Sequence, residues 1–212
     1  MLLKDGRQVN FGYDRRGNQL TGDGRSLKYT EDDKPWEIVS SGVSSRFIYS
    51  SDGQLARQER NGGWTHYVDR GYEYDDKGGW RVYAGDVGVI GYSQSEGYSM
   101  MYTLRDRLGS ATTLVDEQGV VVSRRSYDPF GGMEGEALSD LQQTKGYLRG
   151  FTEHEHLNEH KLIHMIGRVY DYRLGRFLSV DPIIQNPGDS QSFNPYSYIM
   201  NNPLAGTDPT GY

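Results

Sequence analysis

Four histidines and three glutamates lie close together between residues 153 and 164, and their spacing is the first to suggest chemistry. His156, His160 and His164 follow one another at intervals of four. On an α-helix this spacing places three imidazoles on one face, where they could hold a metal ion. Gly167 limits such a helix, and a structural role for neutral histidines is the alternative. The other members of the group are His154, Glu153, Glu155 and Glu159.

Two aspartates followed by proline lie near the carboxyl end, at Asp181 and Asp208. Two carboxyl groups that share one proton could hydrolyse a peptide bond, because crowding of like charges raises the pKa of one and leaves the other ionised. An Asp-Pro pair more often starts a turn, since proline restricts the residue before it. From these residues alone, the turn is the favoured interpretation.

The composition argues against several other kinds of site. The 212 residues include no Cys, so the chain has no thiol nucleophile, disulfide or cysteine zinc site. A net charge of −6 argues against a nucleic-acid interface, which needs clustered Lys and Arg. No apolar run approaches the roughly 20 residues of a membrane span, and no signal-peptide core follows Met1. We therefore expect no nucleic-acid partner and no membrane span. Either a segment upstream has been removed, or the protein leaves the cell by a route that reads no amino-terminal signal.

Short antiparallel strands are the elements predicted to position these residues. A polar chain with 28 Gly and 17 Tyr suits a half-solvated sheet better than a helical bundle. Hairpin signals recur up to about residue 127, and a strand near residue 100 alternates, with its larger apolar residues on one face. The clearest turns are Ser51 to Gly53, Asn61 to Gly63, Asp76 to Gly79 and Glu117 to Gly119, and the alternating residues are Tyr98, Met100, Tyr102 and Leu104.

The later part of the chain differs from the earlier part in composition and in the elements that it predicts. Residues 136–145 and 153–160 favour two short helices. Beyond Leu162 the chain is dense in Gly, Pro and Asn, so we expect this tail to wrap over other elements rather than form a regular sheet. We expect two parts, a degenerate repeat sheet over residues 1–101 and a different module over residues 102–212.

Tyr-Asp pairs recur along the chain, each followed by a glycine within a few residues. In such a unit Tyr would pack on the sheet while Asp starts the turn. The unequal spacing makes the repeat a weak signal by itself. Exposed Tyr and Trp also suit stacking on sugars, although lining of a sheet is the favoured role. Examples are Tyr13-Asp14, Tyr127-Asp128 and Tyr170-Asp171.

A series of ordered blocks from about residue 102 to the end is specific enough to indicate a family. In order and spacing these blocks closely resemble the carboxy-terminal end of the Rhs repeat-associated core, and the earlier residues resemble the degenerate Tyr-Asp repeats that precede it. The blocks are Asp106 to Ser110, Tyr127 to Gly131, Leu162 to Asp171, Gly175 to Pro182, Asn194 to Tyr198, Asn201 to Leu204 and Asp208 to Gly211. The chain departs from the family at Arg107, Ile166, Tyr172 and Pro195, where members usually carry His, Asn, Pro and Arg.

This resemblance implies a fold and a set of partners. Rhs proteins and the related Tc-toxin C proteins are hollow shells in which a long spiralling β-sheet encloses a toxic carboxy-terminal domain. The expected fold is mainly β, a meander of Tyr-Asp hairpins in the wall of a β-cage, with an irregular Pro- and Gly-rich plug and one or two short helices. The expected partners are the chain's own downstream toxin domain and the upstream Rhs shell. A type VI secretion spike (VgrG) and an adaptor or immunity protein are further partners that the family suggests, for a bacterial protein that is cytoplasmic before export and then delivered to a target cell.

The resemblance also assigns a self-cleaving site. The family's two aspartates and one arginine map onto Asp181, Asp208 and Arg168. We expect the aspartates to act as a dyad, while Arg168 holds one carboxylate ionised or stabilises charge on the scissile carbonyl. The expected cut lies on the carboxyl side of Tyr212, where the family usually has an apolar residue, and a chain cut there would end at Tyr212. Such an aspartyl protease would act once on its own chain, without metal or cofactor and without activity on added peptides.

Two other functions stay open. A structural or carbohydrate-binding Tyr-Asp module with no chemistry of its own would use the same sheet. An orphan core that associates with a toxin or immunity partner would account for a Met1 that opens within a repeat, since a complete shell needs far more chain. The histidine group belongs to ordinary structural blocks of the family, so a metal site is the less favoured interpretation of it.

Overall fold

The computed structural model describes residues 8–134, 147–184 and 186–212. Contacts within the chain define two compact units, one made of residues 1–47 with 157–212 and the other of residues 48–156. Short antiparallel strands dominate both units, as the sequence predicts, and the helices of the described residues are single 3-10 turns. Within those ranges, none of the helices is both long and apolar enough to cross a membrane.

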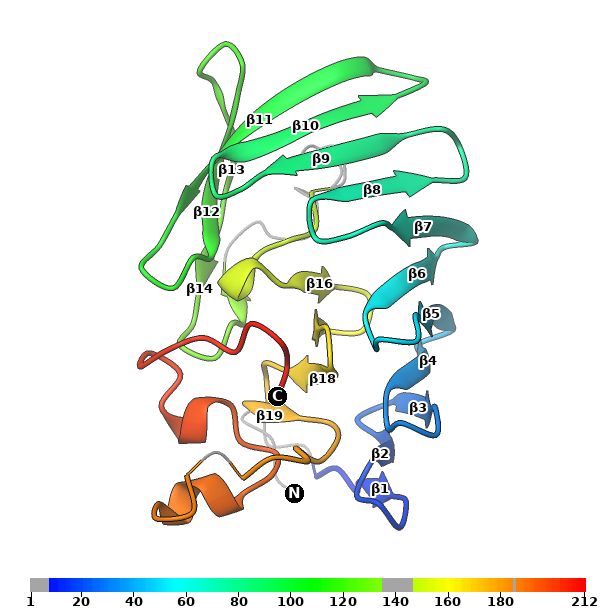
Figure 1. Cartoon of the computed structure of the whole chain (residues 1–212), viewed down its shortest axis with the longest axis vertical. Coiled ribbons are helices and arrows are strands. Elements are labelled where there is room, and N and C mark those ends of the chain that lie inside the picture. Colours follow the sequence, from blue (N-terminus) through cyan, green and yellow to red (C-terminus); the bar gives the residue numbers. More distant parts are fainter. Residues whose placement is uncertain (1–7, 135–146, 185) are drawn as a thin grey trace. The chain divides into compact units, whose positions relative to one another are not determined.

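The second unit is a meander of hairpins (Figure 1). Its strands β6 to β13 are hydrogen-bonded in the order in which they occur in the sequence. The predicted turns at residues 61–63, 76–79 and 117–119 each join two paired strands, which confirms them. The strands are β6 (Leu55–Arg60), β7 (Gly63–Tyr67), β8 (Tyr72–Asp75), β9 (Trp80–Ala84), β10 (Gly88–Ser93), β11 (Gly97–Arg105), β12 (Ala111–Asp116) and β13 (Val121–Arg124). A small separate hairpin, β14 (Ser126–Tyr127) with β15 (Met133–Glu134), and the 3-10 helix η1 (Phe151–Glu153) follow.

Strand β11 alternates as predicted, and its Tyr-rich face is the more exposed one. Tyr98 is 74% exposed and Leu104 57%, whereas Met101 on the opposite face is only 5% exposed. Met101 packs in a core cluster with Val89, Ala111, Leu114 and Tyr147. The sheet therefore buries its aliphatic face and leaves Tyr on the other, which the amphipathic Tyr ring tolerates.

The first unit combines an amino-terminal meander with the carboxy-terminal quarter of the chain. Strands β1 to β5 again pair in sequence order. Leu27 and Ile38, opposite each other on β3 and β4, are buried. The strands are β1 (Gly12–Tyr13), β2 (Gln19–Gly22), β3 (Arg25–Tyr29), β4 (Pro35–Ser40) and β5 (Val43–Tyr49), whose last two residues belong to the second unit.

A regular hairpin sheet after Leu162 corrects the expectation for the tail. Strands β17 (Leu162–Met165), β18 (Arg168–Asp171) and β19 (Arg176–Phe177) are paired and antiparallel. Every residue of β17 and β18 is buried, so their backbone groups need a hydrogen-bonded ladder in place of water. After Phe177 the chain is irregular as predicted, apart from the 3-10 helices η2 (Ser190–Phe193) and η3 (Ile199–Asn201).

The predicted helix over residues 153–160 is wrong. Thr152 and Glu153 have φ of 45° and 63°, which interrupts any α-helix, and the chain then enters strand β16 (Glu155–Leu157). Burial of His156, whose ring nitrogen Nε2 accepts a hydrogen bond from the Phe151 N–H at 3.1 Å, favours this path. The other predicted helix, residues 136–145, lies outside the described residues.

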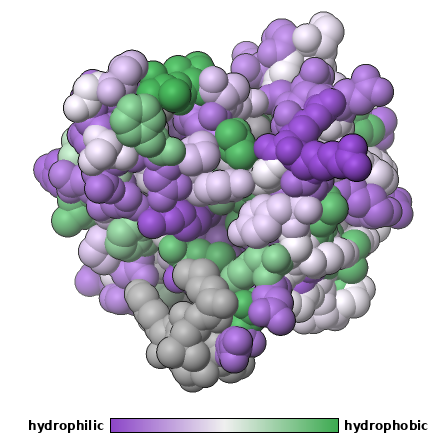
Figure 2. Space-filling model, turned by 90° about the horizontal axis from the view of Figure 1, so that it is seen from below, coloured by the Kyte–Doolittle hydropathy of each residue, from purple (hydrophilic) through white to green (hydrophobic). Residues whose placement is uncertain are grey.

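Polar and apolar side chains are interspersed on the face of the molecule shown in Figure 2. Small groups of apolar residues alternate there with polar ones, as the mean hydropathy of −0.76 leads one to expect. On this face, therefore, no broad apolar patch identifies a binding surface by itself.

Candidate functional site

A single turn, Asp-x-x-Gly, recurs through both units. In the turn at Asp116, the Oδ1 atom accepts hydrogen bonds from the N–H groups of Gln118 and Val120 at 3.0 and 2.8 Å. Gly119, three residues after the aspartate, takes the left-handed conformation with φ of 81°, which glycine adopts at little cost. The predicted role of Asp as the start of the turn is thus confirmed. Turns of this form begin at Asp14, Asp75, Asp106, Asp116 and Asp128.

Asp208 starts the same kind of turn at the carboxyl end. Its Oδ1 accepts hydrogen bonds from the N–H groups of Thr210, Gly211 and Tyr212 at 3.3, 2.8 and 3.1 Å. Gly211 has φ of 79°, and a Cβ built there would lie 1.9 Å from the Met165 carbonyl oxygen. This turn folds the last residues back against β17 and β18, where the carboxyl end lies in Figure 1. Only one oxygen of Asp208 is used by the turn, which leaves Oδ2 for a further contact.

Arg168, the first residue of β18, meets both aspartates at one atom. Its Nη2 donates a hydrogen bond to Asp181 Oδ2 at 2.9 Å and lies 3.5 Å from Asp208 Oδ2. Its Nε donates to the Gly211 carbonyl oxygen. The three residues that the sequence assigns to one site are therefore in contact, together with the backbone immediately before Tyr212.

The guanidinium of Arg168 is held in place on several sides. Its side chain is 2% exposed and stacks on the Phe177 ring with a centroid distance of 3.6 Å. Its Nη1 donates to the Pro195 carbonyl oxygen at 3.2 Å. Ile166, two residues earlier, has φ of 59°, an unusual conformation for a β-branched residue. A sharp turn and a stacked ring thus fix the direction in which Arg168 points.

Asp181 is positioned by its own backbone and by its neighbours. Its N–H donates to the Pro195 carbonyl oxygen at 2.9 Å, and its Oδ1 accepts from the Ile183 N–H at 2.8 Å. A cavity of about 30 Å³ adjoins its carboxylate, which is room for a single water molecule. The cavity is lined by Arg168, Asp181, Ile183, Ser192, Asn194, Pro195, Ser197, Ile199, Met200 and Asp208.

Burial sets the electrostatics of this group. It raises the pKa of Asp208 above the ordinary value, against the lowering effects of the Gly211 N–H and the Arg168 guanidinium. Burial also lowers the pKa of Arg168, and the charges of Asp181 and Asp208 oppose that change. An arginine so paired stays protonated near neutral pH. The site therefore holds one fixed positive charge, and Asp208 gives up its proton less readily than an exposed aspartate.

Lys34 belongs to this site although the sequence did not single it out. Its Nζ donates a hydrogen bond to the Tyr212 hydroxyl at 2.9 Å across a separation of 178 residues. No local pattern marks Lys34, because its partner is fixed only by the folding of the chain. In the structure, the turn before β4 brings Lys34 to this position, and Asp33 takes a left-handed φ of 59° there.

The histidine group does not form the helical face of the metal interpretation. In the first unit, His160 contacts the hydroxyls of Ser40 and Ser45 at 2.6 and 2.9 Å, and His164 stacks on Phe47 at 5.0 Å. In the second unit, burial lowers the pKa of His156 to about 3, so this imidazole is neutral. Nowhere in residues 8–134, 147–184 and 186–212 do three potential ligands gather as a metal site requires.

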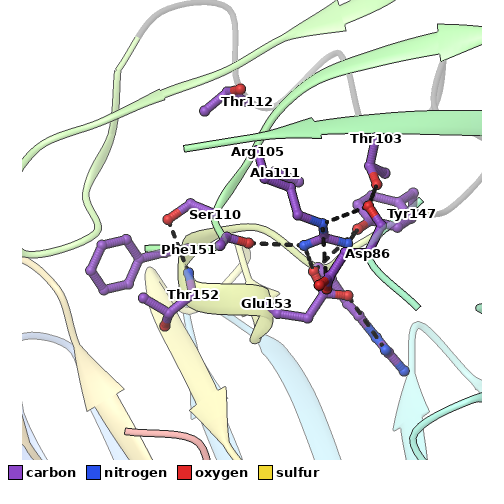
Figure 3. Close-up of polar contacts among 12 residues, drawn as sticks. Asp86, Thr103, Arg105, Ser110, Ala111, Thr112, Tyr147, Phe151, Thr152 and Glu153 are labelled. Carbon is purple, nitrogen blue, oxygen red and sulfur yellow. Dashed lines mark hydrogen bonds and ion pairs between the residues drawn. The ribbon is translucent and has the colours of Figure 1, made fainter. Parts of the chain in front are cut away.

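A second polar cluster, in the second unit, surrounds Arg105 (Figure 3). The Arg105 guanidinium pairs with Glu153 and donates to the Gly109 carbonyl at 2.9 Å and to the Tyr147 hydroxyl at 3.3 Å. Burial raises the pKa of Tyr147 to about 12, so its hydroxyl stays protonated. Each of these groups has its partner within the cluster, and we interpret it as a structural tie between β11 and η1.

The sequence of the chain is similar to that of several known proteins. The family model for the teneurin YD-shell matches residues 89–204. The tRNA3(Ser)-specific nuclease WapA of Bacillus spizizenii is 29% identical over 216 residues, which cover 96% of this chain and 9% of that protein. Salivary gland surface protein 1 of Aedes aegypti is 32% identical over 127 residues, covering 60% of this chain and 3% of that protein. The chain thus spans less than a tenth of the length of these relatives.

Solved structures share the fold. The crystal structure of TcdB2-TccC3 superposes with a TM-score of 0.80 at 20% identity, covering 94% of this chain and 11% of that one. The Tc holotoxin pore of Photorhabdus luminescens gives 0.78 at 19% identity, with 94% and 10% covered. At these identities the likeness concerns the fold, which is that of the Tc-toxin shell.

Proposed function

The chain belongs to the teneurin YD-shell family, and from this premise we propose that Asp181, Asp208 and Arg168 cut their own backbone just after Tyr212. The chain is a piece of an Rhs-type shell related to toxin-associated proteins. Cleavage at this point would release whatever segment follows the shell.

The observation that carries the proposal is the convergence of both carboxylates on one guanidinium nitrogen. Arg168 Nη2 contacts Asp181 and Asp208, while Nε of the same side chain holds the Gly211 carbonyl. Carboxylates that converge in this way could divide one proton between them. The peptide bond proposed to be cut follows Tyr212, one residue after this carbonyl. The substrate is therefore held close to the two carboxyl groups that would act as acid and base. Such positioning contributes a large part of catalysis when substrate and catalyst share one chain.

In the proposed reaction, a water molecule beside the carboxylates attacks the carbonyl carbon of Tyr212 and gives a proton to Asp181. The oxyanion that forms collapses as the bond between this carbon and the next nitrogen breaks, and Asp208 gives its proton to that nitrogen. The products are a carboxyl group on Tyr212 and a new amino terminus. The cavity that adjoins Asp181 and Asp208 is large enough for this water.

The surroundings of the two aspartates suit different roles, Asp208 as the acid and Asp181 as the base. Asp208 keeps its proton to a higher pH because burial raises its pKa, which suits the acid. Asp181 accepts hydrogen bonds from Arg168 and from the Ile183 N–H, which hold its carboxylate beside the cavity proposed for the water molecule. Arg168 orients both groups and the backbone that leads to the cut.

The larger proposal is that the shell encloses a toxic domain joined after Tyr212. A relative named as a tRNA nuclease has most of its chain outside the matched region, so a comparable toxic activity would lie beyond this fragment. The proposed partners are that downstream domain and the upstream shell, and for export a type VI secretion spike with an adaptor or immunity protein. A shell that is cut only once needs no turnover on added peptides.

The test is cleavage of the full chain with a reporter peptide of known mass joined after Tyr212. We expect the wild type to be cut, and Asp181→Asn or Asp208→Asn to lower the cleavage rate by a factor of about 10² or more. An Asn at position 208 keeps an oxygen that can accept the three backbone hydrogen bonds, so the turn is retained while the acid is lost. Mass spectrometry of the released fragment locates the cut.

Asp116→Asn is the matched control, because Asp116 starts a turn of the same form in the second unit, whereas the site belongs to the first. It should leave the cleavage rate unchanged. Wild-type cleavage rates in both the Asp181 and the Asp208 variants would show that the dyad is assigned wrongly.

The second candidate function is a purely structural part of the shell that does not cut itself, and one observation favours it. Asp208 Oδ1 accepts hydrogen bonds from the second and fourth N–H groups after it, as does Oδ1 of Asp116 in a turn that joins two paired strands, so a structural function alone would account for them. The same experiment decides, because this candidate requires the wild-type chain to stay intact at neutral pH while Arg168, Asp181 and Asp208 are all present.

A further inference from the structure

The side chain of Tyr212 occupies a recess built from two distant segments of the first unit. Its hydroxyl accepts a hydrogen bond from Lys34 Nζ at 2.9 Å and lies 3.4 Å from the Gly167 carbonyl oxygen, to which it donates. The same ammonium lies 5.1 Å from the centre of the Tyr212 ring. Both hydrogen-bonding capacities of the phenol are therefore used, and its ring contacts a cation.

Gly167 makes room for this ring. A Cβ built on Gly167 would lie 2.3 Å from the Cε2 atom of Tyr212, so a larger residue would displace the aromatic side chain. The Gly167 N–H donates to the Thr210 carbonyl oxygen at 2.9 Å, which holds the two backbones together beside the ring. The absence of a side chain at position 167 is therefore what lets the Tyr212 ring lie against this backbone.

Lys34 is presented to the recess by a short turn. The Thr30 N–H donates to the Lys34 carbonyl oxygen at 2.8 Å, and the Lys34 N–H donates to the Thr30 hydroxyl at 3.2 Å. Only 9% of Lys34 is exposed. A buried ammonium loses free energy when it faces an alkyl group, since such a group offers no acceptor in place of water. A phenol oxygen at this place is therefore better matched to Lys34 than a leucine side chain.

We propose that Lys34 and Gly167 form a recognition pocket that selects tyrosine as the residue on the amino side of the cut. The inference rests on the proposed function for its cleavage readout, and it adds the specificity of that reaction. Lys34 is a specificity-determining residue here, because it contacts the side chain of residue 212 and none of the bonds that change.

The cleavage test is a double-mutant cycle in the full chain with a reporter peptide after Tyr212. Tyr212→Phe and Lys34→Met should each slow cleavage about tenfold, as expected for a hydrogen bond to a charged group. Because both remove the same contact, the double variant should be no slower than the slower single variant. The preference for Tyr over Leu at position 212 should fall about tenfold in the Lys34→Met background. Lys28→Met, which alters a lysine on β3 that is paired with Glu37, should change none of these rates.

A second readout needs no self-cleavage. In the chain that ends at Tyr212, we expect carboxypeptidase to release residue 212 about tenfold faster from the Lys34→Met and Tyr212→Phe variants than from the wild type. The Lys28→Met chain should behave as the wild type. This assay measures whether the pocket holds the side chain, whatever the chain does to its own backbone.

The two readouts separate the pocket from the reaction. An uncut wild type with faster carboxypeptidase release in the Lys34→Met chain would reject the proposed cleavage and keep the pocket. A cut wild type in which the effects of Lys34→Met and Tyr212→Phe multiply, or in which neither variant matters, would overturn the pocket and leave the cleavage proposal standing.

Discussion

Arg168 differs from Arg105 in the part of the backbone that it contacts. Arg105 in the second unit has a carboxylate, a phenol and a carbonyl as partners, which is the pattern of a structural tie. Arg168 contacts two carboxylates and, unlike Arg105, also the backbone just before Tyr212. The residue types were visible in the sequence, but their meeting at a single nitrogen was not.

A pH dependence follows from the burial of Asp208. Because burial raises its pKa in the folded state, Asp208 is protonated over a wider pH range than in the unfolded chain. Protonation therefore favours the folded segment, and this contribution is lost as the pH rises through the folded-state pKa. As the proposed acid, Asp208 also loses its transferable proton over that interval. We expect the self-cleavage rate to fall there as pH rises, measured by gel densitometry across a pH series.

The residual cleavage of an Asp208→Asn chain is the control for this dependence, since an amide does not titrate. Its rate should lack the alkaline fall of the wild type. A rate that rises with pH in the wild type would contradict the assignment of Asp208 as the acid.

The element that recurs is the Asp-x-x-Gly turn. It connects the strands of hairpins, and at Asp208 it forms part of the candidate site. At Asp116 and Asp128 it joins or follows strands, and at Asp208 it folds the last residues onto β17 and β18. This turn is a local device, because the aspartate reaches N–H groups only two to four residues away. For that reason the turns could be predicted. Strand pairing after Leu162 could not, since it follows from burial on both faces of β17 and β18.

Two glycines in equivalent turns separate the effect of backbone conformation from the effect of packing against distant residues. Gly119 and Gly211 have nearly the same φ, 81° and 79°, but a Cβ at Gly119 would meet no atom within 4 Å, whereas one at Gly211 would meet the Met165 carbonyl. We expect Gly119→Ala to lower the free energy of unfolding by about 1 kcal/mol and to leave cleavage intact. Gly211→Ala should displace the carboxyl end and slow cleavage by a factor of about 10².

Urea unfolding and the reporter-peptide assay measure the two effects. Equal cleavage rates in Gly211→Ala and Gly119→Ala would show that the fit of Gly211 against Met165 is irrelevant to the reaction.

At the scale of the molecule, the first unit joins the two ends of the chain through buried charges. Arg25 on β3 pairs with Asp171 at the end of β18, and its Nη2 lies 3.7 Å from Asp23. Arg173 also pairs with Asp23. These contacts connect the amino-terminal meander to the hairpin that carries Arg168, so the stability of that unit and the geometry of the site are linked.

Removal of Arg25 should therefore be costly. Arg25→Met leaves the fully buried Asp171 carboxylate without its closest cation, and breaking such a pair lowers the free energy of unfolding by about 3 to 5 kcal/mol. Arg16→Met removes a more exposed pair with Asp33 at 3.3 Å and should cost less than about 1 kcal/mol. Urea unfolding of the two variants provides the comparison, and equal losses would refute the role given to the buried pair.

The sequence by itself determined the local features: the mainly β fold, the turns that start at aspartate and the candidates Arg168, Asp181 and Asp208. These depend on neighbours in the chain and on an ordered series of motifs. Its prediction of a helix at residues 153–160 failed because left-handed residues and a buried histidine outweighed the local pattern. The division near residue 101 stays a prediction. Only the tertiary structure decided that Lys34 meets Tyr212 and that two aspartates share one guanidinium, because contacts between distant residues depend on how the whole unit packs.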